Sequence, residues 1–142
     1  MTPVENIFKV FLGQIGKDIL AELPEDIAYD LMLDYLKGST LMFNTCSKDL
    51  SISFDEDEGT HVINSNLDLD EIYILANGMI VYWLKPKIYT LEIIKMGMTD
   101  GDFSKKSTAP LLGRLIELKK IAEQDMRRQK VKYSYKDKSI NE

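Results

Sequence analysis

The sequence predicts an all-α fold: a small helical bundle with a long C-terminal helix, an irregular acidic loop and an extended C-terminal tail. Apolar residues recur at spacings of three and four along much of the chain, as on the buried face of a helix. Proline and acidic residues stand where first helical turns favour them. With 142 residues, the chain suits one core-forming unit. We divide it into a helical domain at 1–130 and a tail at 131–142.

Two helices are predicted in the first third of the chain. Thr2, Pro3 and Glu5 are typical of a helix start, and one apolar stripe follows them. The stripe consists of Ile7, Phe8, Phe11, Leu12 and Ile15. Pro24 and the two acids after it begin a second helix, which we expect to end near Asn44.

The stretch 67–103 organises the rest of the chain. Asp68 and Glu71 have the spacing of a capping box, in which each side chain bonds the backbone amide of the other residue. This spacing predicts a helix start at Asp68. From 72 to 84 the only clearly polar side chain is Asn77, so no face of this helix is suited to water. We therefore expect it to lie at the centre of the fold.

Pro86 cannot donate an amide and clashes with the preceding turn, so we expect the central helix to stop or kink near Lys85. A second helical segment is predicted from 88 to about 96, ended by Gly97 and the polar cluster at 99–102. The apolar run before Pro86 is too short to cross a bilayer, which takes roughly 20 residues. No membrane association is expected.

The segment 46–66 has no sustained helical or strand period and is predicted to be a loop. An alternative is brief strand-like pairing of 52–54 with 62–63 across the acidic run at 55–58. That run lacks the ligand alternation and the distal glutamate of a calcium loop. A solvated turn is therefore favoured over a metal site.

A long helix is predicted from 110 to about 130. Its end is basic, where the helix dipole favours positive charge. The basic residues are Arg127, Arg128, Lys130 and Lys132. The tail that follows begins with VKYSY, whose alternation is typical of a strand with nothing local to pair with, so it either frays or docks on a partner. The basic cluster and its tyrosines fit a solvated helix end, a single-stranded nucleic-acid site or a protein contact.

No enzymatic activity, metal or cofactor is expected. Cys46 and His61 have no third orienting group around them, and a single Cys with a single His excludes a disulfide and the usual zinc spacings. The net charge of -5 weighs against a protein whose main task is to grip nucleic acid. The N-terminal residues lack the features of a signal peptide, so synthesis in the cytoplasm is expected.

Three motifs together resemble the small helical head-to-tail connector, or adaptor, proteins of tailed bacteriophages. They are DEIYILANGMIVYWLKP at 70–86, D-F-x-x-x-S at 102–107, and a basic helix end followed by YSY at 133–135. Residues 7–11, 30–43 and 49–50 fit the same order, so the resemblance covers most of the chain. The stretch 88–98 departs from the expected pattern.

The resemblance implies a structural protein of the virion neck, assembled in the host bacterial cytoplasm. Identical subunits, commonly twelve, would form a ring beneath the portal protein, extend the DNA channel and present a platform to the next neck or tail protein. DNA would pass without specific binding, and residues 131–135 would dock on the portal or a neighbouring subunit, by adding a strand. Candidate contact residues are Tyr82, Trp83, Tyr89, Arg127, Arg128, Tyr133 and Tyr135. Head closure, tail completion and nucleic-acid regulation are the alternatives.

Overall fold

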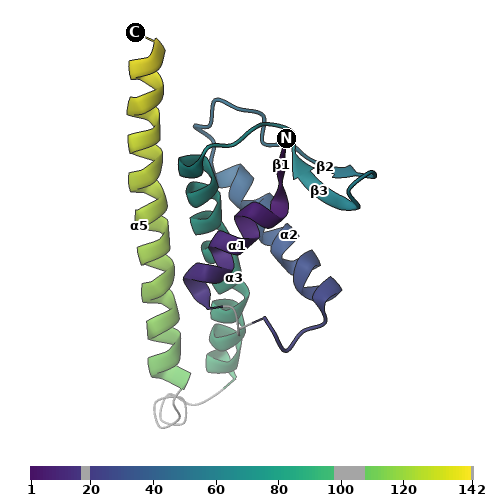
Figure 1. Ribbon diagram of the computed structural model, residues 1–142. Coiled ribbons are helices and arrows are strands. Elements are labelled where there is room, and N and C mark those ends of the chain that lie inside the picture. Colours follow the sequence, from purple (N-terminus) through teal and green to yellow (C-terminus); the bar gives the residue numbers. More distant parts are fainter. Residues whose placement is uncertain (17–19, 98–107, 142) are drawn as a thin grey trace.

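The computed structural model describes residues 1–16, 20–97 and 108–141, and the predicted helical fold with a long C-terminal helix is confirmed. Within these residues the chain forms four helices and three short strands (Figure 1). The helices are α1 (Val4–Ile15), α2 (Glu25–Met42), α3 (Leu69–Met96) and α5 (Thr108–Asn141). The polar cluster at 99–102 and the D-F-x-x-x-S motif lie outside the described residues.

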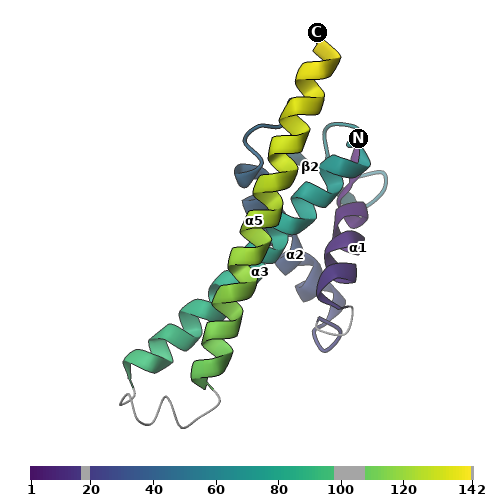
Figure 2. The same ribbon diagram turned by 90° about the vertical axis from the view of Figure 1, so that its left-hand side faces the viewer.

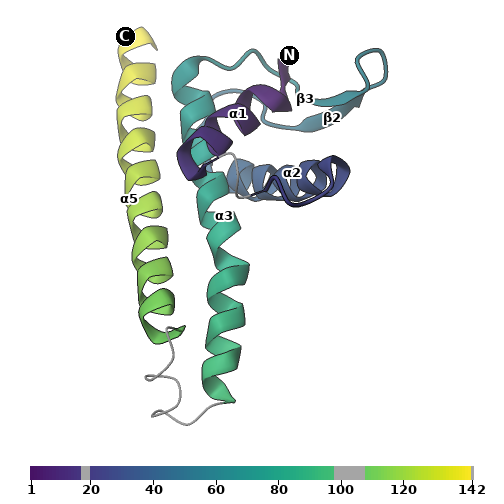
Figure 3. The same cartoon turned by 60° about the horizontal axis from the view of Figure 1, so that its bottom comes forward.

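The two longest helices, α3 and α5, run side by side in all three ribbon views (Figures 1–3). Helices α1 and α2 pack against the first half of α3, on the side away from α5 (Figure 3). The second half of α3 and the start of α5 therefore project as a two-helix arm. We call this part, residues 85–96 with 108–120, the arm.

The main core lies where α1, α2, α3 and α5 meet, and the predicted helical stripes supply it. Ile7 and Phe11 of α1 are fully buried, together with Leu36 of α2. The central helix contributes most, and, in keeping with its predicted central place, buried apolar residues lie on more than one of its sides. Those of the main core on α3 are Ile74, Leu75, Ala76 and Met79.

The start of α3 is confirmed in detail. Of the two outcomes predicted near Lys85, a stop or a kink, the stop is wrong. The Asp68 carboxylate accepts from the Glu71 amide at 2.9 Å, and the Glu71 carboxylate accepts from the Asp68 amide at 2.8 Å. The helix then continues through Pro86 to Met96. A proline inside a helix costs about 3 kcal/mol. Here that cost is offset because the turns on either side pack onto α5 through a second, smaller core of Leu84, Ile88 and Leu112.

The segment predicted as a loop contains a β-hairpin, as the alternative interpretation proposed. Strands β2 (Ile52–Asp55) and β3 (Thr60–Ile63) pair antiparallel, and β1 (Thr2–Pro3) adds to the other edge of β3 in the order β1-β3-β2. The acidic run forms the turn between them. Asp55 accepts from the amides of Asp57 and Glu58, at 3.1 and 3.4 Å, so the turn interpretation is confirmed.

The predicted extended tail is wrong, because α5 continues through residue 131 and ends at Asn141. The backbone therefore has no break at the expected division between domain and tail. Packing explains the difference. Met126 and Tyr133 are seven residues apart and both are buried on the side of α5 that faces the bundle. A docking mode in which 131–135 adds a strand does not fit this helix.

Candidate functional site

The aromatic residues predicted to contact a partner along α3 have different environments. Tyr82 is half-buried and packs so closely on α2 that a Cβ at Gly38 would lie 2.6 Å from its ring. Trp83 is half-buried, with its ring centroid 6.4 Å from that of Phe11 in an edge-on arrangement. Tyr89 on the arm is 63% exposed. Of these three, Tyr89 is the residue best placed for a partner, while Tyr82 and Trp83 serve largely in internal packing.

Tyr89 belongs to an exposed apolar stripe that the sequence analysis did not single out. Ile93 and Met96 follow it at spacings of four and three, so all three side chains project from the same side of the helix. Their exposed fractions are 63%, 68% and 85%. The stripe lies at the end of α3 that extends beyond α1 and α2 (Figure 2). We call Tyr89, Ile93 and Met96 the arm stripe.

Two grooves run along the seam between α3 and α5. One, of about 370 Å³, lies beside the arm stripe and has charged residues at its rim. It is lined by Lys85, Ile88, Tyr89, Glu92, Ile116, Lys119, Lys120 and Glu123. The other, of about 410 Å³, is lined largely by apolar side chains, among them Ile80, Trp83, Leu118 and Ile121. Both are open surface features, suited to contact with another molecule.

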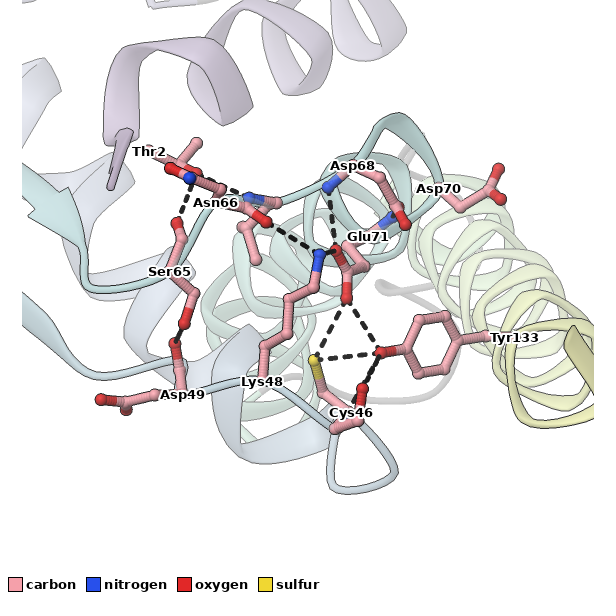
Figure 4. Close-up of polar contacts among 12 residues, drawn as sticks. Thr2, Cys46, Lys48, Asp49, Ser65, Asn66, Asp68, Asp70, Glu71 and Tyr133 are labelled. Carbon is pink, nitrogen blue, oxygen red and sulfur yellow. Dashed lines mark hydrogen bonds and ion pairs between the residues drawn. The ribbon is translucent and has the colours of Figure 1, made fainter. Parts of the chain in front are cut away.

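A buried carboxylate fixes the C-terminal half of α5 to the rest of the fold (Figure 4). The side chain of Glu71 is fully buried and accepts from Lys48 Nζ at 2.6 Å and from the Tyr133 hydroxyl at 2.9 Å. Tyr133 in turn accepts from the Ser47 amide at 3.2 Å, and its ring packs edge-on against Phe43. We call Cys46, Ser47, Lys48, Glu71 and Tyr133 the Glu71 network.

The electrostatics of the Glu71 network explain how a carboxylate can be buried there. Burial alone would raise the pKa of Glu71, but hydrogen bonds from Lys48, the Asp68 amide and Tyr133 outweigh it and lower that pKa. Burial raises the pKa of Tyr133 to about 12, and hydrogen bonding to Cys46 and Glu71 adds to the increase. Burial also raises the pKa of the Cys46 thiol. The network therefore contains an ionised Glu71, a neutral Tyr133 and a thiol rather than a thiolate.

Tyr133 was predicted to contact a partner, whereas the structure buries it among residues of its own chain. Its side chain is only 8% exposed, and its hydroxyl is directed at Glu71 and Ser47 within the same chain. Arg127, Arg128 and Tyr135 lie on the outer side of α5 and are exposed, so they remain candidates. The neighbouring residues in the sequence do not indicate that Tyr133 is buried while Arg127, Arg128 and Tyr135 are exposed. The hydrogen-bond partners of Tyr133 are more than 60 residues away.

Cys46 and His61 belong to separate networks. Cys46 Sγ lies 3.8 Å from the Glu71 carboxylate, whereas His61 Nδ1 lies 3.0 Å from the Tyr29 hydroxyl. Among the described residues, no group of three or more His, Cys, Asp or Glu side chains is arranged to hold a metal ion. In the same part of the chain, no helix has the length and apolar character that crossing a membrane requires.

Comparison of the chain with protein-family models, with curated proteins and with solved structures finds no match. The surfaces described above therefore indicate where the chain can bind a partner. Of those surfaces, the arm stripe and the outer side of α5 are accessible to a partner. The Glu71 network is internal.

Proposed function

We propose that this protein is a structural subunit of the head-to-tail connector of a tailed bacteriophage. In this proposal, copies form a ring, commonly of twelve, beneath the portal protein and extend the DNA channel toward the tail. The ring presents a platform to the next neck or tail protein, in the virion neck, without catalysing a reaction. The motif resemblance at 70–86 and 133–135 supports this assignment.

The observation that carries the proposal is the arm stripe. Three large apolar side chains, each more than 60% exposed, share one side of a helix on a part of the molecule that projects from the core. Apolar groups gathered in this way on a protein surface mark contacts with other proteins. A connector subunit must bind components above and below it, and a projecting helical arm suits that task.

The net charge of the protein is consistent with a channel role. At -5, the chain as a whole repels phosphate, which favours passage of DNA over retention. Eight of the 23 acidic residues lie on α2 and in the hairpin turn, and the hairpin lies on the side away from α5 (Figures 1 and 3).

The direct test is electron microscopy of the purified particle. The expected result is density for this chain in a closed ring between the portal and the tail. A mature particle that lacks the chain would refute the proposal. Rings of the same chain at the head-closure or tail-completion position would favour those alternatives instead.

A second test addresses the arm stripe itself. The double variant Ile93→Glu/Met96→Glu should lose assembly onto portal-bearing heads while its unfolding midpoint stays unchanged, because both side chains are exposed. Leu69→Glu is the matched control, since Leu69 is also 68% exposed but lies at the opposite end of α3. Equal assembly by the double variant and the control would contradict a role for the stripe.

A helical nucleic-acid-binding regulator is the second candidate, and the exposed Arg127 and Arg128 favour it. This function requires DNA binding by the isolated protein, with an affinity that falls steeply as salt is added, since phosphate contacts release counterions. Binding of this kind that Arg127→Glu/Arg128→Glu abolishes would favour the regulator over the connector.

A further inference from the structure

The outer side of α2 presents acidic and apolar residues that the fold does not cover. Ile27, Asp30, Asp34 and Leu41 occupy positions that point the same way on the helix, opposite the buried Met32. Ile27 is 47% exposed and Leu41 is 79% exposed, and both aspartates between them are exposed. We call these four residues the α2 face.

The outer side of α5 presents a similar arrangement with the opposite charge. Ile121, Arg128, Val131 and Tyr135 occupy positions on the side of the helix opposite the buried Met126, and Ile121 also borders the groove between α3 and α5. Ile121 is 44% exposed, Val131 is 50% exposed and Tyr135 is 69% exposed, and the arginine between them is also exposed. We call these four residues the α5 face.

The two faces match in length and in charge. Each spans 14 residue steps, from Ile27 to Leu41 and from Ile121 to Tyr135, which is about 21 Å at 1.5 Å per residue. Between Ile27 and Leu41 two acids, Asp30 and Asp34, outnumber the single basic residue Lys37. Between Ile121 and Tyr135 four basic residues outnumber two acidic ones; they are Arg127, Arg128, Lys130 and Lys132 against Glu123 and Asp125. Apolar groups stand at both ends of each face with the charges between them, so two such helices can pair along their length.

Within one chain α2 reaches α5 at its C-terminal end, where Lys130 Nζ donates to the Met42 carbonyl at 3.0 Å, and the rest of α2 extends away from α5 (Figures 1 and 3). Complementary surfaces at two different places on one molecule define a head-to-tail contact, which closes into a ring when the rotation between copies allows it. We propose that the α2 face of one copy binds the α5 face of a second copy. This inference rests on the proposed function, since it identifies the contact that would build the connector ring.

A second copy fits the α5 face better than nucleic acid does. The basic residues occur on a chain whose net charge is -5, so a phosphate backbone would be repelled by the molecule as a whole. Ile121 and Tyr135, at the two ends of the face, also have counterparts on α2 at the same spacing, Ile27 and Leu41. Phosphates offer no comparable apolar group to Val131 or Ile121.

The test uses two charge-reversed variants of the full chain, measured by sedimentation velocity at low and high salt. One variant is Asp30→Lys/Asp34→Lys and the other is Arg127→Glu/Arg128→Glu. In each variant the α2 face and the α5 face carry charge of the same sign and repel each other between copies. Each variant should therefore self-associate at least about tenfold more weakly than wild type. In a one-to-one mixture, every acidic face again meets a basic face, so association should return. High salt should weaken both the wild type and the mixture.

Lys9→Glu/Lys87→Glu is the matched control, because it changes the net charge as much as the arginine variant but lies on neither face. It should associate like wild type. A wild type that stays monomeric up to its solubility limit, or variants that associate as the control does, would overturn the pairing. If the arginine variant associates like wild type but loses a binding to duplex DNA that the wild type shows, the α5 face is assigned to nucleic acid instead.

The two proposals fail in different ways. Rings in the particle neck that persist with both charge variants would overturn the α2–α5 pairing and leave the connector function in place. Absence of the chain from particles would remove the connector function, whatever the sedimentation results show.

Discussion

Replacing Tyr133 with Phe removes one hydroxyl from the Glu71 network and leaves the aromatic ring against Phe43. The lost bond is a donation to a buried, ionised carboxylate at 2.9 Å, and bonds of this kind contribute about 1.5–3 kcal/mol. The Ser47 amide, at 3.2 Å, also loses its acceptor, but Ser47 is exposed and water can replace it. We therefore expect Tyr133→Phe to lower the free energy of unfolding by about 2 kcal/mol.

The measurement is urea unfolding followed by circular dichroism. With a urea dependence of about 2 kcal/mol per molar, typical of a chain of this size, the midpoint should fall by about 1 M. Tyr73→Phe is the matched control on α3. Tyr73 is 41% exposed, and its hydroxyl makes no hydrogen bond within the described residues, so the midpoint should change little. Equal midpoints for the two variants would refute the role assigned to the Tyr133 hydroxyl.

Two further predictions concern the buried residues Glu71 and Gly78. Because the folded state lowers the pKa of Glu71 below 4.5, the stability it contributes is present above pH 4.5 and is lost as the pH falls through the folded-state pKa. Glu71→Gln should lower the free energy of unfolding by about 2 kcal/mol at neutral pH. Between about pH 5 and 3 its unfolding free energy, measured by urea titrations, should fall less than that of the wild type. An equal fall in the variant and the wild type would contradict this prediction. A Cβ at Gly78 would lie 2.0 Å from Ser39 Oγ, so Gly78→Ala should destabilise by roughly 1–3 kcal/mol. Gly113→Ala is the control, because its Cβ meets open space on a helix and should stabilise the protein by about 0.5–1 kcal/mol. If thermal unfolding shows that both variants change the stability in the same direction, the packing at Gly78 is refuted.

The sequence was sufficient for features that local chemistry decides. The starts of α1, α2 and α3 were predicted because a proline, an acidic first turn or a capping box acts within a few residues of each start. The central place of 72–84 in the fold followed from its lack of a polar face. These signals need no knowledge of the rest of the fold.

The sequence was insufficient where a distant segment decides the structure. Helix α3 passes through Pro86 because Leu112, in the next helix, packs against Leu84 and Ile88. Strand β3 pairs on both edges, with β2 close by in sequence and with Thr2–Pro3 from the other end of the chain. Neither contact leaves a periodic pattern of its own in the sequence.

The misinterpreted tail shows how a short pattern can fit two structures. In VKYSY, alternation places Tyr133 opposite Val131 and Tyr135, as in a strand. A helix gives the same outcome, because residues four apart share one side and the residue between them lies on the other. The structure follows the helical solution, with Tyr133 buried and both neighbours exposed. Five residues were too few to distinguish a period of 2 from one of 3.6.

The burial of Tyr133 also determines which variants can test docking by the end of α5. Tyr133 fixes the rotation of the helix about its axis, and that rotation directs Val131 and Arg128 outward. Deleting residues 131–142 would remove the Tyr133 anchor together with half of the α5 face, so lost assembly could reflect either change. Charge reversal at Arg127 and Arg128 leaves the anchor in place, whereas Tyr133→Phe leaves the outer residues in place. Comparing these two variants therefore separates the stability of α5 from the contact that its outer side makes.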